Sequence, residues 1–154
     1  QWLTDNNLIE LAAEMDIKMR LFFVSDAGYE SLKLFERSLT RFGADIPHTL
    51  VRNFGMTDDW SPVTDDHELQ ALIERYKVKV IDLPRFIGNA DRNFIDRHSI
   101  SFGEALTHPA LGAISRHRVK TFLKKTYQAF ESAQLFPQST VTAQKVQQGG
   151  QHHG

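Results

Sequence analysis

"TLVRNFGM", residues 49–56, is a short apolar run that ends on a side-chain amide, Asn53, followed two residues later by Gly55. An apolar run of this length, bounded by turn-forming residues, is typical of a buried strand. Two further runs of the same character lie on either side of it, "IKMRLFFVS" at 17–25 and "VKVIDLP" at 78–84. The sequence therefore predicts three short strands.

Helical patterns surround these strands. Apolar residues recur at helical spacing in five segments, at 2–15, 26–45, 65–77, 101–112 and 115–133. Alternation of strands and helices predicts the α/β class, with a partial parallel sheet and flanking helices joined by right-handed crossovers. The apolar patterns end near residue 133, so we expect one domain over 1–133. The composition of 134–154, which is rich in Gln, Ser, Thr, Gly and His, predicts a disordered tail.

Local signals set the expected helix ends. Asp26 or Ser31 can begin the second helix, and Gly43 can end it in a left-handed conformation. Either Asp65 or Asp66 can cap the third helix. The fourth helix begins with Ser101 followed three residues later by Glu104, the pattern of a capping box.

Two segments read as loops. Residues 56–66 are acidic and turn-forming, and Pro62 argues against a regular element there. Residues 84–100 mix charges with Gly88 and isolated aromatic side chains, so we expect a loop with some helical turn.

The overall composition excludes several classes of site. The chain has 154 residues, no cysteine and a formal net charge of −1, so disulfides and thiolate chemistry are excluded and no global charge favours nucleic acid or a membrane surface. No apolar stretch approaches the length of a membrane span. We therefore expect a cytoplasmic protein. The chain begins with Gln1 and continues directly into a helical pattern, which suggests a fragment of a longer protein.

Ligands of open parallel sheets bind beyond the carboxyl ends of the strands, and Asn53 and Pro84 stand at two of those ends. The amide of Asn53 offers a donor and an acceptor in one plane, which matches the N6 and N7 edge of adenine. From its spacing alone, it is first of all the kind of side chain that hydrogen-bonds a turn at the end of a strand. Pro84 can lay a loop backbone against a flat base or can simply end its strand.

Other polar clusters give weaker signals. Five cations on the last helix, with Phe122 between them, can contact nucleic acid or an acidic partner, or can form an ordinary solvated face. These cations are Arg116, Arg118, Lys120, Lys124 and Lys125. The aspartates of the acidic loop and the seven histidines lack the spacing of known metal sites, so no metal site is predicted. The sequence contains neither GxxxxGK[ST] nor GxGxxG.

Taken together, the chain resembles the carboxyl-terminal half of the ParA/MinD-type (CobQ/CobB/MinD/ParA) P-loop ATPases over about residues 1–133. The resemblance rests on a strand ending in a small polar turn, a strand ending in a V-x-N turn and a strand ending in a proline turn. Two helical segments follow the same order. The matching segments are "LFFVSDAGYESLKLF", "TLVRNFGM", "VKVIDLPRF", "ISFGEAL" and "ISRHRVKTFLKKTYQAF".

The resemblance implies the carboxyl-terminal half of a three-layer α/β/α P-loop fold. It gives Asn53 the role of reading adenine and places Pro84 and Arg85 against the base. It puts the phosphate-binding loop and the acidic residues for Mg²⁺ before Gln1, so ATP with Mg²⁺ belongs to the complete protein and this chain alone would not hydrolyse ATP. Arg52, Phe54 and the acidic segment 56–66 depart from the common family pattern.

The subgroup most similar to this chain acts in plasmid partition, stability or conjugative mobilisation. It implies a homodimer in the complete protein and DNA, or a DNA-bound adaptor, as partner. The alternative function is a stand-alone α/β binding module that uses the basic helix at 116–125 to hold a protein or a nucleic acid. A different nucleotide-using α/β enzyme, whose first half is also missing, is a third interpretation.

Overall fold

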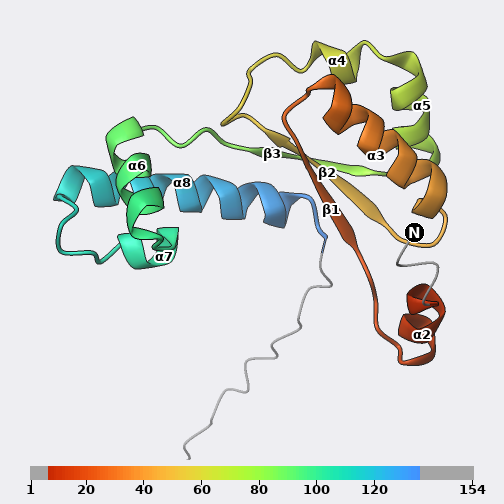
Figure 1. The fold of residues 1–154 in the computed structure, drawn as a ribbon, viewed down its shortest axis with the longest axis horizontal. Helices are drawn as coiled ribbons and strands as arrows, with labels where there is room; N and C mark the ends of the chain where they lie inside the picture. Colours follow the sequence, from red (N-terminus) through yellow and green to blue (C-terminus); the bar gives the residue numbers. More distant parts are fainter. Residues whose placement is uncertain (1–6, 136–154) are drawn as a thin grey trace, which may run out of the picture.

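The computed structural model describes residues 7–135, and its core is a sheet of three parallel strands in the order β1-β2-β3 (Figure 1). This sheet confirms the predicted α/β class. The strands are β1 (Leu21–Ser25), β2 (His48–Asn53) and β3 (Lys79–Leu83). The helices are α2 (Leu8–Glu14), α3 (Tyr29–Phe42), α4 (Ser61–Thr64), α5 (His67–Arg75), α6 (Asn89–His98), α7 (Phe102–Ala105) and α8 (Ala113–Ser132).

Helices cover both faces of the sheet. Successive side chains of a strand point to opposite faces, and β1 shows this directly. Phe23 packs on Phe35 of α3 with ring centroids 5.2 Å apart, whereas Phe22 stacks on Phe130 of α8 at 6.0 Å. Helix α3 therefore lies on one face and α8 crosses the other.

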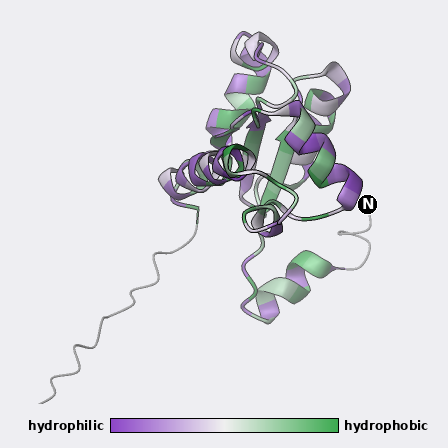
Figure 2. Ribbon diagram, turned by 90° about the vertical axis from the view of Figure 1, so that its left-hand side faces the viewer, coloured by the Kyte–Doolittle hydropathy of each residue, from purple (hydrophilic) through white to green (hydrophobic). Residues whose placement is uncertain are grey.

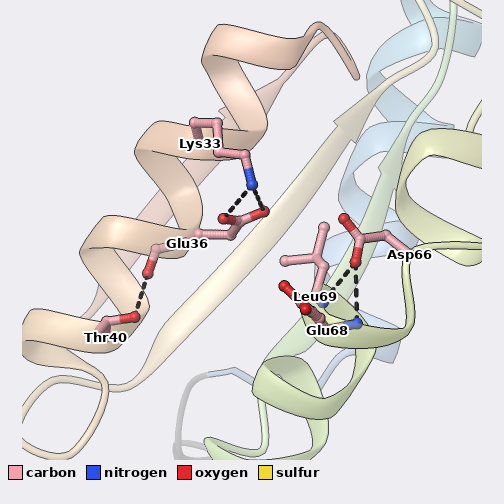
Figure 3. Close-up of polar contacts among 6 residues, drawn as sticks. All are labelled: Lys33, Glu36, Thr40, Asp66, Glu68 and Leu69. Atoms are coloured by element: carbon pink, nitrogen blue, oxygen red, sulfur yellow. Dashed lines mark hydrogen bonds and ion pairs between the residues drawn. The ribbon is translucent and has the colours of Figure 1, made fainter.

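The face under α3 and α5 carries the larger core. Phe35, Leu39, Leu50 and Leu69 are completely buried there. Asp66 caps α5, because one of its carboxylate oxygens accepts hydrogen bonds from the backbone N–H groups of the second and third residues after it, as Figure 3 shows. Of the two capping residues predicted from the sequence, Asp65 and Asp66, the structure therefore uses Asp66.

A surface ion pair lies on α3 in the same view. The Nζ of Lys33 lies 2.8 Å from a carboxylate oxygen of Glu36 (Figure 3). The hydrogen bond to Glu36 raises the pKa of Lys33 above its ordinary value. Both side chains are accessible to solvent, so the pair contributes little to stability.

A second, smaller core joins α6, α7 and α8 around Ile95, Ala105, Leu111 and Val119. The predicted capping box begins α7. Ser101 accepts a hydrogen bond from the backbone N–H of Glu104, and the Glu104 carboxylate accepts one from the backbone N–H of Ser101. The backbone N–H of Ser101 lowers the pKa of the Glu104 carboxyl most, and the Ser101 side chain lowers it further. The box fixes where α7 begins beside the long helix.

Helix α2 contributes no fully buried residue, and Figure 2 shows it at the margin of the fold. Leu8, Ile9 and Ala12 are partly buried whereas Leu11 and Met15 are exposed, so the apolar stripe predicted for 2–15 is only partly covered in the described part of that helix. Residues 1–6 and 136–154, the latter being most of the predicted tail, lie outside the described residues. Leu135, which the sequence assigned to the tail, is buried. Between residues 7 and 135, no helix has the length and apolar character that crossing a bilayer requires.

Several predicted boundaries are wrong. Gly28, rather than Asp26 or Ser31, precedes the first turn of α3, and Asp26 instead accepts a hydrogen bond from the Gly28 N–H. Gly43 ends α3 with φ of −64°, which is right-handed. The backbone N–H of Gly43 donates to the carbonyl of Leu39, as it would inside a helix. Gly43 therefore continues the helical conformation and does not end α3 in a left-handed one.

Two segments expected to be loops contain helices. Pro62 lies in the first turn of α4, where its missing N–H would have had no intrahelical partner. Within 84–100, α6 forms from Asn89 to His98 and buries Ile95 and Asp91 on one side. Most of the charged side chains of that segment lie on the solvent-exposed side of α6.

Candidate functional site

Three residues predicted to bind a base lie together at the carboxyl ends of β2 and β3. Asn53 is the last residue of β2 and pairs in register with Leu83, directly before Pro84 and Arg85. All three line one cavity of about 260 Å³. Parallel pairing therefore brings together residues that are separated by about thirty positions in the sequence.

Asn53 makes the turn that follows its strand. Its Oδ1 accepts a hydrogen bond from the backbone N–H of Gly55 at 2.9 Å, and its backbone carbonyl accepts one from Met56. A Cβ at position 55 would lie 2.8 Å from that Oδ1, so a larger residue there would force the Asn53 side chain to shift. Within residues 7–135, the amide nitrogen of Asn53 donates no hydrogen bond. Asn53 therefore stabilises the turn through its Oδ1, and its Nδ2 remains able to donate a hydrogen bond to a ligand.

Arg85 holds the two strand-end loops together. Its Nε donates to the carbonyl of Phe54 at 3.0 Å, and its Nη2 pairs with Asp58 at 2.9 Å. The sequence assigned Asp58 to a solvated acidic loop and missed this contact, because no local pattern links residues 27 positions apart. The pair is exposed, so its effect is on the position of Arg85 more than on stability.

Aromatic side chains from three different elements form one wall of the cavity. Phe86 follows β3, Phe102 begins α7 and Phe122 lies in α8. Their ring centroids are 4.8–5.5 Å apart, within the usual range for packed aromatic pairs. The sequence placed Phe122 between the cations of the last helix and did not connect the three rings. An apolar wall with a few polar groups is typical of small-molecule sites.

Arg52 points away from this cavity, to the face that α3 and α5 cover. Its guanidinium pairs with Asp82 on the neighbouring strand at 2.6 Å and 2.9 Å and lies over the rings of Phe54 and Trp60. Arg52 therefore contributes to the packing of the strand-end loops on that face and not to the cavity.

The basic residues of α8 do not form a single stripe. An α-helix turns by about 100° per residue, so Arg118 and Lys125 are about 20° apart, while Lys120 and Lys124 are roughly 120–160° from Arg118. Arg118 is already paired with Asp91 at 3.0 Å, and Arg116 donates to the carbonyl of His108 at 3.5 Å. The five cations are therefore divided between two sides of the helix.

The acidic loop has local partners. Asp59 accepts hydrogen bonds from the hydroxyl and the backbone N–H of Ser61, and these bonds lower its pKa, the hydroxyl contributing most. Across the part of the chain that the structure describes, no three His, Asp or Glu side chains come together as a metal site would need.

Comparison with known proteins gives no match. No family model, no curated protein and no solved structure is significantly similar to this chain. Any functional role for the cavity at the ends of β2 and β3 therefore rests on its own geometry, and the ParA/MinD-type resemblance stays a prediction from short motifs.

Proposed function

We propose that the cavity lined by Asn53, Pro84 and Arg85 binds the base of an adenine nucleotide. The observation that carries the proposal is their convergence, with an aromatic wall, on one cavity beyond the carboxyl ends of two parallel strands. Open α/β sheets bind ligands at this edge. We call this cavity the base cavity.

The size of the base cavity suits one ring system. Its volume is about 260 Å³. Complete sites for drug-sized ligands run from about 300 to 1,000 Å³. A flat base beside Phe86 and Phe102 fits the smaller volume, and the sugar and phosphates would extend out of it.

The chemistry of Asn53 favours adenine over guanine. An amide oxygen has two lone pairs, and the Gly55 N–H occupies one on Asn53. The second lone pair can accept from N6 of adenine while the amide nitrogen donates to N7. Guanine presents two acceptors along the same edge, O6 and N7, so the oxygen of Asn53 would face another acceptor.

The wider proposal follows the family resemblance. On this proposal, the chain is the nucleotide-base-binding half of a cytoplasmic ParA/MinD-like ATPase. The complete ATPase acts as a homodimer in plasmid partition, stability or conjugative mobilisation. Its partner is DNA or a DNA-bound adaptor. Phosphate and Mg²⁺ would be held by a part of that ATPase other than the described residues. Residues 7–135 would supply the recognition of the base.

A binding module that uses the basic face of α8 is the second candidate. Lys120 and Lys124 support it, because both are exposed. The division of the five cations between two sides of α8 weighs against it, since no single face of the helix presents them all.

The change Asn53→Asp tests base binding while keeping the turn. Aspartate retains an oxygen for the Gly55 N–H and loses the donor that N7 of adenine requires. We expect the dissociation constant for adenosine, measured by NMR titration of the full chain, to rise about tenfold, since a bidentate base contact contributes about 1–3 kcal/mol. Neutral adenosine avoids repulsion between a phosphate and the new carboxylate.

Asn93→Asp is the matched control. Asn93 lies on α6 with its side chain exposed, so the same change of charge there should leave adenosine binding unaltered. Unchanged binding in Asn53→Asp, with the fold intact by circular dichroism, would show that Asn53 does not read the base.

A further inference from the structure

A second cavity, of about 230 Å³, lies beside the base cavity and shares Arg85 and Phe122 with it. It opens between the segment after β3 and one side of α8. Its lining residues are Arg85, Ile87, His117, Arg118, Thr121, Phe122 and Lys125. We call it the basic cavity.

The lining of the basic cavity is positively charged. Arg85, Arg118 and Lys125 are cations, and no carboxylate from residues 7–135 lines the cavity. Thr121 adds a hydroxyl. Neither Lys125 nor Thr121 makes a side-chain hydrogen bond or ion pair within residues 7–135, so their donors are available to a ligand.

The two arginines are held in place by contacts outside the basic cavity. Asp91, which is 7% exposed, accepts from Nη1 of Arg118, and Arg85 uses Nε and Nη2 to contact Phe54 and Asp58. Each guanidinium therefore keeps further N–H donors, Nη2 of Arg118 and Nη1 of Arg85 among them. Groups that are oriented before binding lose less conformational entropy when a ligand arrives.

We propose that the basic cavity binds the phosphoryl group of a small phosphorylated ligand, independently of the base cavity. A phosphate offers several charged oxygens, which suit the planar fork of arginine and the point charge of lysine. The acidic partners of both arginines lie outside the lining, so they orient the cations without occupying the space of the anion.

The arrangement favours a small ligand over a nucleic-acid strand. A strand needs a row of cations that follows successive phosphates. Lys120 and Lys124 lie on the other side of α8 from Arg118 and Lys125, so no such row continues from the basic cavity along the helix.

Titration with inorganic phosphate tests the proposal. Chemical shifts of the full chain are followed at constant ionic strength, with chloride as the balancing anion. We expect saturable shifts at Thr121 and Lys125. In Lys125→Gln the dissociation constant for phosphate should rise about tenfold, because one charge-assisted contact is lost. Lys120→Gln, on the same helix but outside the basic cavity, should bind as the unmodified chain does.

Three outcomes would overturn the proposal. The first is no saturable shift with phosphate beyond that of chloride. The second is equal weakening by Lys125→Gln and Lys120→Gln, which would indicate general attraction to the helix. The third is a single-stranded oligonucleotide that binds more tightly than phosphate and depends equally on both lysines, which would favour nucleic acid. Adenosine has no phosphate, so failure here is distinguishable from failure of the base cavity.

Discussion

Replacing Phe35 with alanine should lower the free energy of unfolding by about 3–5 kcal/mol, the usual cost of removing a large aromatic side chain from a core. Phe35 is completely buried and packs against Phe23 of β1 at a centroid distance of 5.2 Å. Truncation would remove the largest side chain that α3 packs on the sheet and leave a cavity that the parallel strands cannot close. Urea denaturation followed by circular dichroism measures the change.

Leu34→Ala is the matched control for Phe35→Ala. Leu34 is the preceding residue of the same helix, and it is 54% exposed. We expect it to cost less than about 1 kcal/mol, because alanine is also a good helix former and little buried area is lost. Similar losses in the two variants would mean that α3 presents a different face to the sheet.

The change Gly88→Ala should lower the free energy of unfolding by about 2–3 kcal/mol, through backbone strain and a steric clash together. Gly88 precedes α6 with φ of 130° and ψ of 78°, a conformation that residues with a Cβ rarely adopt. A Cβ there would lie 2.8 Å from a carboxylate oxygen of Asp91 and 3.3 Å from Cδ of Arg118. The substitution therefore strains the turn and presses on the ion pair that joins α6 to α8.

Gly112→Ala separates this effect from the general cost of replacing a glycine. Gly112 precedes α8 in the same way that Gly88 precedes α6, but its φ is −66°, and a Cβ at this position would meet no atom within 4 Å beyond its chain neighbours. We expect Gly112→Ala to change stability by less than about 1 kcal/mol, since its conformation suits alanine. Thermal unfolding of both variants measures the difference, and equal destabilisation would contradict the left-handed turn at Gly88.

Short-range signals allowed the sheet to be predicted from the sequence. Each strand is an apolar run that ends at a polar or proline turn, and helical patterns between the runs require parallel pairing. The helices α4 and α6 were harder to predict. Pro62 was interpreted as a breaker although the first turn of a helix accepts proline, and the apolar side of α6 is narrow, with Asp91 buried beside Ile95.

Part of the base cavity could be predicted in the same way. Asn53 and Pro84 stand at strand ends, and parallel topology alone brings strand ends to one edge. The aromatic wall could not be predicted, because Phe86, Phe102 and Phe122 come from elements whose packing depends on the whole fold. The same holds for the pairing of Arg85 with Asp58.

Base selectivity of the full chain tests the proposed function most directly. In ¹H–¹⁵N NMR spectra, adenosine should shift the side-chain amide of Asn53 and the backbone amides of Gly55 and Phe86, which line the base cavity. Guanosine at the same concentration should shift them much less, because its O6 opposes the oxygen of Asn53. Equal shifts with both nucleosides, or shifts only at residues away from the base cavity, would contradict adenine recognition at this site.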